Sequence, residues 1–268
     1  MRYFLRAWLF LQIALYSHSA ALAGAWLQPQ GRGLAVAQGT YYATNSYFDQ
    51  EGEKQPQARF QKQEFNLYAE YGVFDHLTLG SNLFINRVSQ LGEARYSLAD
   101  SEFFVRRSIW QTESTQVSLQ PLFKLPSLAS EKESPRGGSR SLDGEISFLV
   151  GKNLHLVSPR DFLDTRMGYR ARSRGLSAQF RGDVVLGLGL SERLMLLPAL
   201  RVIAAQSPDT SEVFEENGEQ DYDLMKGELG LVYQLSDSRS LHASIFSHLS
   251  GSRTGSGEGV SVGYGIRF

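Results

Sequence analysis

The sequence predicts an all-β fold: one antiparallel transmembrane β-barrel of about twelve strands. Three observations support this fold class. Segments of alternating apolar and polar residues recur along the chain, the loops between them alternate between short and long, and the final segment ends on an aromatic residue. A segment with period two has two unlike faces, as a strand between lipid and a barrel interior has.

Residues 1–23 have the three parts of a secretory signal peptide. Two arginines precede an apolar stretch over residues 7–16, and the small-residue sequence at 21–23 is typical of a cleavage site. The apolar stretch is too short to span a bilayer, and the alternative is a buried N-terminal helix. We expect cleavage after Ala23, which leaves 268 − 23 = 245 residues as one barrel domain, 24–268.

Twelve alternating segments are expected to be strands, and most are long enough to cross a bilayer when tilted. In residues 64–71, for example, Phe65, Leu67 and Tyr71 alternate with polar residues. The expected strands are 33–43, 60–72, 76–86, 95–109, 115–125, 141–152, 162–173, 178–190, 194–205, 221–235, 240–249 and 258–268. Ten or fourteen strands remain alternatives.

The lengths of the connections alternate in the manner of an outer-membrane barrel, with short periplasmic turns and longer outside loops. A β-sandwich has no reason to sort its loops in this way, and its strands are shorter. The short turns are 73–76, 111–114, 191–194 and 236–239, and the long loops are 44–59, 126–140, 206–220 and 250–257. The link 153–161 is of middling length where a short turn is expected.

The last segment is expected to close against the first, with Val260, Val262, Tyr264, Ile266 and Phe268 facing outer-membrane lipid. Phe268 then lies at the periplasmic interface, where aromatic girdles occur. The alternation of Tyr264, Ile266 and Phe268 resembles the C-terminal signal of outer-membrane barrels, which implies recognition by the barrel-assembly machinery. Together with the signal peptide, this predicts a location in the outer membrane of a Gram-negative cell.

Composition excludes several classes of function. The chain has no cysteine, so it can form no disulfide, thiol nucleophile or Cys-based metal site. Its net charge of −1 argues against general nucleic-acid binding. The acid-rich segment 207–223 matches no calcium-loop spacing, and no cofactor or metal is expected.

The face opposite the lipid is charged. The expected pore-lining residues are Glu102, Arg106, Lys124, Glu145, Arg166, Arg170, Arg172, Arg181, Asp183, Arg201, Lys226 and Glu228, with Asp100, Asp143 and Asp164 on the same parity. Strand pairing is expected to oppose Glu102 to Lys124, Asp183 to Arg201, and Arg170 to Arg181. Two interpretations remain open. The charges fill a narrow barrel with salt bridges, or they line a water-filled pore that guides anionic or sugar-like solutes.

One motif could carry chemistry. His248 and Ser250 are two residues apart, a spacing that places them on the same face of a strand. This spacing is similar to that of outer-membrane lipid hydrolases of the phospholipase A and lipid A deacylase types, with Glu258 as the available orienting group. The alternative is a polar rim near an outside loop. There is no G-x-S-x-G sequence, P-loop or paired-histidine motif.

Four stretches, 24–33, 64–80, 97–110 and 118–126, together resemble the Xag-type outer-membrane proteins of Gram-negative bacteria. The genes of that family tend to accompany glycosyltransferases for surface polysaccharide and biofilm matrix. The resemblance implies outer-membrane placement and a link to a polysaccharide synthesis or export system, and it brings no catalytic residues.

The leading expectation is therefore a non-enzymatic channel or export conduit for a surface polysaccharide or another polar or anionic solute. The alternatives are a lipid hydrolase that uses Ser250 and His248, and a plugged structural barrel.

Overall fold

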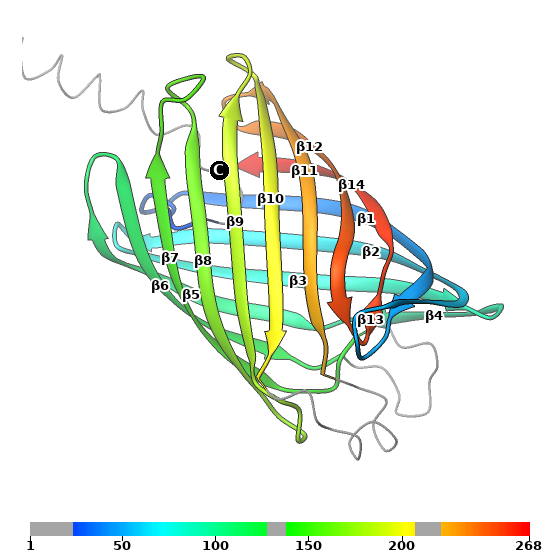
Figure 1. The fold of residues 1–268 in the computed structure, drawn as a ribbon. Helices are drawn as coiled ribbons and strands as arrows, with labels where there is room; N and C mark the ends of the chain where they lie inside the picture. The colour runs from blue at the N-terminus through cyan, green and yellow to red at the C-terminus, as the bar shows by residue number, and fades with distance from the viewer. Residues whose placement is uncertain (1–23, 128–137, 207–220) are drawn as a thin grey trace, which may run out of the picture.

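The computed structural model describes residues 24–127, 138–206 and 221–268, and all regular structure in them is β (Figure 1). The strands are β1 (Gly33–Phe48), β2 (Lys54–Phe74), β3 (Leu77–Gln90), β4 (Glu93–Leu98), β5 (Ser101–Gln111), β6 (Thr115–Leu125), β7 (Asp143–Asn153), β8 (Phe162–Arg172), β9 (Gln179–Gly189), β10 (Leu194–Ala205), β11 (Asp223–Ser236), β12 (Arg239–Ser252), β13 (Thr254–Gly255) and β14 (Glu258–Arg267). No helix in these ranges is long and apolar enough to cross a membrane.

The strands form one closed antiparallel barrel with twelve strand positions. β4 and β5 both pair with β3, and β13 and β14 both pair with β1, so each of these two pairs makes one interrupted strand of the barrel. Every other strand pairs with its neighbours in sequence, and β1 closes the ring between β2 and β14. The fold class and the strand count predicted from the sequence are confirmed.

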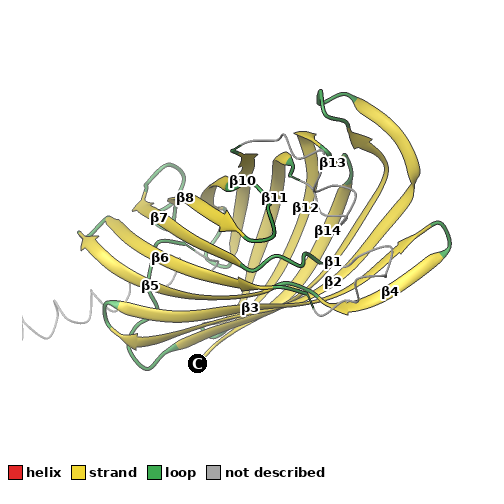
Figure 2. Cartoon of the chain, turned by 90° about the horizontal axis from the view of Figure 1, so that it is seen from below, coloured by secondary structure: helices red, strands yellow, loops and turns green. Residues whose placement is uncertain are grey.

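The predicted loop 44–59 is largely wrong. β1 continues to Phe48 and β2 begins at Lys54, so most of this segment is a paired hairpin that extends the barrel wall (Figure 2). The predicted loop 250–257 likewise contains the end of β12 and the short strand β13. The predicted signal peptide lies outside the described residues, as do most of the predicted loops 126–140 and 206–220.

The outward face of the cylinder carries exposed apolar side chains, as a lipid-facing surface requires. In the row predicted from the last segment, Val260, Val262, Ile266 and Phe268 are exposed. The same face includes Phe65, Leu67, Leu79, Leu83, Ile85, Ile146, Phe148, Leu229, Leu231, Leu241 and Ile245.

The two ends of the barrel sequence meet at one rim. The backbone N–H of Gly33 donates to the Phe268 carbonyl at 2.7 Å, and the N–H of Phe268 donates to the Gly33 carbonyl at 3.0 Å. The Phe268 ring lies over Gly33, where a Cβ atom would overlap it. A side chain at position 33 would therefore require the Phe268 ring to move.

Strand register confirms two of the three expected charge pairings and corrects the third. Glu102 lies opposite Lys124, and Asp183 lies opposite Arg201. Arg170, however, lies opposite Gln179 instead of Arg181. The β8–β9 hairpin turns on Arg174 and Gly175, both at positive φ, which is the backbone of a tight type I′ turn. This turn is centred one residue earlier than the prediction assumed, and the register therefore moves by two.

Candidate functional site: the barrel lumen

The inward faces of the barrel strands enclose a cavity of about 710 Å³. Eight of the twelve expected pore-lining residues line it: Glu102, Arg106, Arg166, Arg181, Asp183, Arg201, Lys226 and Glu228. Lys62, Glu64, Asp164, His242 and His248 also contribute. These side chains come from strands on both sides of the ring, so the cavity lies inside the barrel and not within one wall.

The wall formed by β8 to β11 carries an excess of positive charge. Arg166 pairs with Asp183 at 2.7 Å. Arg201 and Lys226 share Glu228 at 3.4 and 3.3 Å, and Arg181 donates to the Gln179 side chain at 3.1 Å. Four cations on these strands line the cavity together with three acids, Asp164, Asp183 and Glu228. The expected Asp183–Arg201 bridge is absent from these contacts, because each partner finds a closer charge on the same inner face.

The other four expected residues are buried in ion pairs on the adjoining wall. Lys124 pairs with Asp143 at 2.8 Å and with Asp100 at 3.2 Å. Arg172 pairs with Asp221, which is fully buried, at 3.0 Å. These contacts fill the barrel interior along β6 to β8.

Arg170 is the centre of this filled half. Its guanidinium binds Glu145 at 2.7 Å and Glu102 at 2.8 Å, and only 3% of its side chain is exposed. Glu102 therefore takes Arg170 as its partner, although Lys124 lies directly opposite it in the sheet. The lumen is thus divided between a packed ionic wall and an open cation-rich wall.

A segment that was not predicted from the sequence lies inside the lumen. Residues 24–32, which we call the N-terminal strap, precede β1 and enter the barrel. The strap is held to β2 and β3 by Gln28, whose backbone N–H donates to Thr78 Oγ1 at 2.9 Å and whose side chain donates to Glu70 at 2.8 Å.

The strap's other end is held by the packed wall. The Ser118 hydroxyl donates to the Ala25 carbonyl at 2.6 Å, and Arg106 donates to the Trp26 carbonyl at 3.0 Å. The Ala25 N–H donates to Asp164 Oδ2 at 2.7 Å, and Ala25 is fully buried.

Trp26 is the apolar anchor of the strap. Its ring meets Phe162 edge to face, with centroids 5.5 Å apart, and packs beside Val185 and Leu197. It also covers Gly151, where a Cβ atom would come within 2.6 Å of the indole. This glycine on β7 makes room for the indole against the wall.

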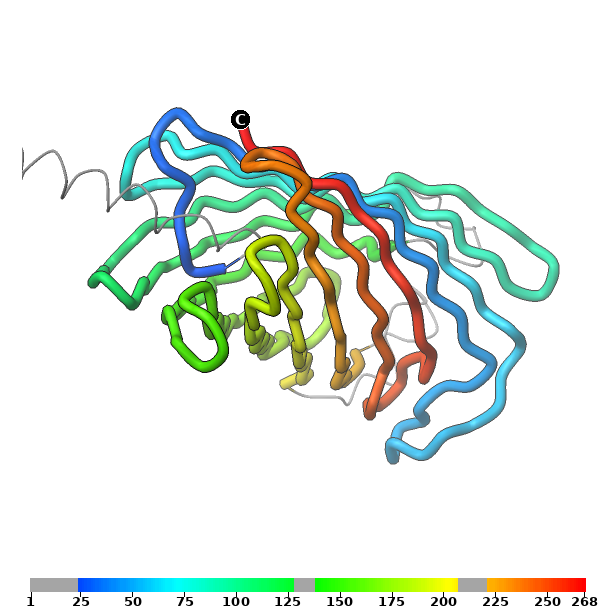
Figure 3. The backbone as a smooth tube through the Cα atoms, turned by 90° about the horizontal axis from the view of Figure 1, so that it is seen from above, coloured from blue at the N-terminus to red at the C-terminus, as the bar shows by residue number. Residues whose placement is uncertain are grey.

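These contacts carry the strap across the lumen. β2 and β3 lie on one side of the ring, and β6 to β8 lie two to four strand positions further round it from β3, as the strand order requires. Figure 3 shows the dark blue segment leaving the rim beside the C-terminus and passing into the barrel. The strap therefore obstructs the end of the lumen at which Gly33 and Phe268 meet.

An aromatic cluster lines the lumen beside the open wall. Tyr42 stacks on Phe246 with parallel rings 6.2 Å apart, and it contacts Phe60 and His248. The Lys226 ammonium lies 4.6 Å from the Phe246 ring centroid. Apolar ring faces and a cation thus share this part of the cavity.

The expected hydrolase motif is not assembled. A β-bulge at Leu249 shifts the register, so that Lys226 pairs with His248 but Met225 pairs with Ser250. Because Lys226 faces the lumen and its neighbour Met225 faces outward, His248 and Ser250 lie on opposite faces. His248 Nδ1 lies 2.6 Å from the Gly255 carbonyl, and Glu258 is exposed on the outward face.

The middling link 153–161 is an ordered turn built around Asp161. This carboxylate accepts hydrogen bonds from the N–H groups of Leu156, Val157, Ser158 and Gly189. Desolvation opposes ionisation of Asp161, but these backbone donors outweigh it and hold its pKa well below the ordinary value. The extra residues therefore form an anchored corner.

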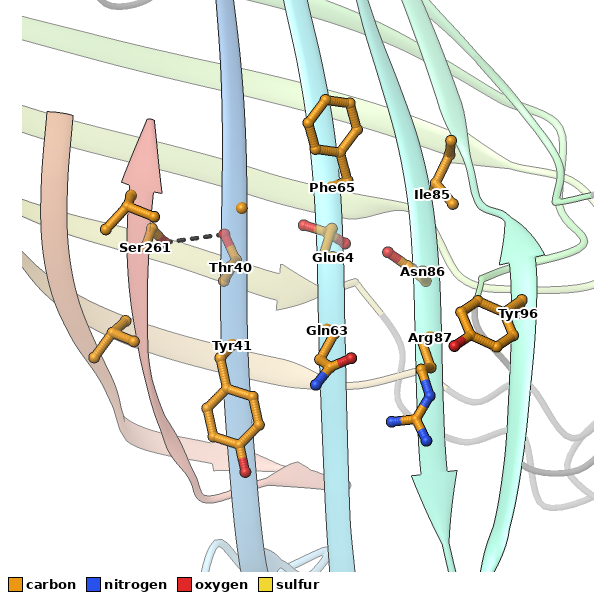
Figure 4. Close-up of a pocket in the computed structure, with 13 residues that line it drawn as sticks. Thr40, Tyr41, Gln63, Glu64, Phe65, Ile85, Asn86, Arg87, Tyr96 and Ser261 are labelled. Atoms are coloured by element: carbon orange, nitrogen blue, oxygen red, sulfur yellow. Dashed lines mark hydrogen bonds between the residues drawn. The ribbon is translucent and has the colours of Figure 1, made fainter. Parts of the chain in front are cut away.

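A second hollow, of about 440 Å³, lies on the outward face across β14, β1, β2, β3 and β4. Its floor is Gly39, where an added Cβ atom would have no neighbouring atom within 4 Å. Figure 4 shows Tyr41, Gln63 and Arg87 in a row on neighbouring strands, beside the row of Phe65 and Ile85. The hollow thus marks a change from apolar to polar side chains on the outward face.

No protein-family model matches the chain, and no curated protein matches it. Among solved structures, the COG4313 outer membrane channel from Pseudomonas putida F1 matches with a TM-score of 0.75 at 12% identity, over 94% of this chain and 98% of that chain. The NanC porin matches with a TM-score of 0.55 at 12% identity, over 87% and 98% of the two chains.

The KdgM porin in complex with disordered oligogalacturonate matches with a TM-score of 0.51 at 9% identity, over 87% of this chain and 99% of that chain. At these identities the likeness concerns the fold. The predicted outer-membrane β-barrel fold is confirmed, and the Xag-type resemblance stays a prediction. The chain has the fold of outer-membrane channels and porins.

Proposed function

We propose that this protein is an outer-membrane channel for polar solutes with a preference for anions. The observation that carries the proposal is the open wall of the lumen, where four cations, Arg166, Arg181, Arg201 and Lys226, face three acids, Asp164, Asp183 and Glu228. Charged linings of this kind select solutes by sign. The similar KdgM structure is described with oligogalacturonate, an acidic saccharide, and this supports the same class of solute here.

Within this class we favour an acidic saccharide. Aromatic rings such as Tyr42 and Phe246 offer flat apolar faces beside the Lys226 ammonium. A surface polysaccharide with carboxylates or phosphates has the matching chemistry, and export of such a glycan is one use of the channel. Assembly through Tyr264, Ile266 and Phe268 and export by a cleaved signal peptide belong to the same proposal.

The test is ion current through the purified protein in a planar bilayer under a salt gradient. The wild type is expected to show a reversal potential that favours anions. Arg201→Glu is expected to move this potential toward cation preference, because Arg201 is half-exposed to the lumen. Arg193→Glu is the matched control, since Arg193 lies in the exposed β9–β10 turn. A silent bilayer, or equal effects of the two variants, would overturn the proposal.

The strap supports a second candidate function: a barrel that stays closed and serves a structural role. Its polar contacts reach both sides of the lumen, and Trp26 is wedged against the wall. A closed barrel gives no current in the wild type and stable current after deletion of residues 24–28. A channel conducts before the deletion, and its conductance rises after it.

A further inference from the structure

Asp164 is a buried carboxylate inside the lumen, and no cationic side chain of the described residues is paired with it. Only 5% of it is exposed. Two guanidinium groups of the lumen form ion pairs elsewhere, Arg166 with Asp183 and Arg106 with Glu70. A buried carboxylate normally has a cationic partner or several donors, because isolated charge is costly to desolvate.

This carboxylate lies against the start of the strap, at Gly24 and Ala25. The Ala25 N–H donates to Asp164 Oδ2 at 2.7 Å. A Cβ atom on Gly24 would overlap the same oxygen. Since the α-nitrogen of Gly24 shares that Cα atom, standard bond lengths place it within roughly 5 Å of the carboxylate.

We propose that removal of the signal peptide after Ala23 creates the missing cation: the new α-ammonium of Gly24 pairs with Asp164 and locks the strap in the lumen. The inference rests on the proposed cleavage site. Hydrolysis of the Ala23–Gly24 bond adds the hydroxyl of water to the Ala23 carbonyl and a hydrogen to the Gly24 nitrogen. The released amine then takes a proton from solvent and carries a positive charge at neutral pH.

This pairing makes the closed strap a property of the processed protein. Before cleavage, the Gly24 nitrogen is an uncharged amide, and among the described residues Asp164 accepts its hydrogen bond from the Ala25 N–H. After cleavage, the carboxylate gains a charge-assisted hydrogen bond in a site away from water. Gly24 leaves room for this pair, because a side chain at this position would require the Asp164 carboxylate to move.

The experiment measures how fast the α-amine of the purified, mature protein reacts with an amine-specific ester at neutral pH. Intact mass first identifies the N-terminal residue, and mass spectrometry of the N-terminal peptide then gives the labelling rate, with Lys54 and Lys152 as internal references. An amine held protonated and shielded reacts at least about tenfold more slowly than a free one. We expect slow labelling in the wild type and about tenfold faster labelling in Asp164→Asn.

Two further proteins make the result specific. Glu228→Gln removes a luminal carboxylate that does not touch the strap, and it is expected to label as slowly as the wild type. Insertion of Gly-Ser between Ala23 and Gly24 leaves every barrel residue unchanged but moves the ammonium away from Asp164, and fast labelling is expected. If Asp164→Asn fails to fold, this insertion alone decides the question.

The inference is overturned if the mature chain does not begin at Gly24. It is also overturned if the wild type and the insertion variant label at the same rate. These outcomes are independent of bilayer current, so a conducting protein with a freely reactive amine refutes the inference and leaves the channel proposal standing.

Discussion

Replacement of Trp26 by alanine is expected to release the strap from the lumen. Truncating a fully buried tryptophan costs about 3–5 kcal/mol, and Trp26 is half-buried, so we assign about 2–3 kcal/mol to its contacts with Phe162, Val185 and Leu197. At about 1.4 kcal/mol per factor of ten, the population of the docked strap falls by roughly 30- to 150-fold relative to the open state. The barrel wall itself loses no strand pairing.

The assay is single-channel recording. The same protein preparation is tested for heat-modifiable migration on a gel, which shows that the barrel is intact. Trp26→Ala is expected to raise the open-state conductance or the open probability. Gly151→Ala should act in the same direction, because its methyl group would overlap the indole from the wall side. Trp110→Ala is the matched control, since Trp110 is 55% exposed on the outward face. Unchanged currents in both Trp26→Ala and Gly151→Ala would refute the view that the strap obstructs the lumen.

Three further perturbations test the wall. Asp161→Asn is expected to lower the unfolding temperature at neutral pH. Because the native pKa of Asp161 is depressed, the stabilisation that its carboxylate provides is present above the unfolded pKa of about 4 and is lost as the pH falls below that value. The unfolding temperatures of wild type and variant should therefore converge in acid, and a difference that stays constant with pH would contradict this. Arg170→Met leaves the buried Glu145 and the half-buried Glu102 without their cation and should cost about 3–5 kcal/mol in urea unfolding, whereas an unaltered midpoint would show that these charges contribute little. Phe268→Ser should reduce the folded fraction recovered from the outer membrane without abolishing refolding in detergent, and equal recovery would argue against a role in assembly.

The strands could be predicted from the sequence because the barrel imposes a local rule. Lipid solvates every second side chain, so the apolar character of residues such as Phe65, Leu67 and Tyr71 predicts that their side chains face outward. The hairpin formed by the ends of β1 and β2 was missed for the same reason. Beyond the lipid both faces of β2 are polar, as at the adjacent residues Lys54 and Gln55, and a paired strand then has the composition of a loop.

The details of pairing depend on backbone features that side-chain patterns do not report. The tight turn at Arg174 and Gly175 moved Arg170 away from Arg181, and the bulge at Leu249 separated Ser250 from His248. Each shift involves one residue, yet each changes which side chains meet. A candidate site built from spacing alone is most vulnerable to this kind of error.

The strap and the ionic wall depend on contacts between residues distant in sequence. Ala25 and Asp164 are 139 residues apart, and nothing periodic connects them. A signal for the strap did exist. The segment before β1 contains Trp26 and Leu27, which are too apolar for a free linker in water, and a buried position for them could have been predicted from composition.

The anchoring of the strap limits how far it can open. Near β1 it is fixed by backbone pairing, since the Gly31 N–H donates to the Gly72 carbonyl at 2.8 Å and the Gly72 N–H donates to the Arg32 carbonyl at 2.9 Å. Gly31 has a positive φ of 74°, and an added Cβ atom there would have no neighbour within 4 Å, so Gly31 can serve as the pivot about which the strap opens. Only residues 24–28 depend on side-chain contacts across the lumen. Full release of Trp26 and deletion of residues 24–28 should therefore give the same open-state conductance. A larger conductance after the deletion would place the pivot nearer to Trp26 than to Gly31.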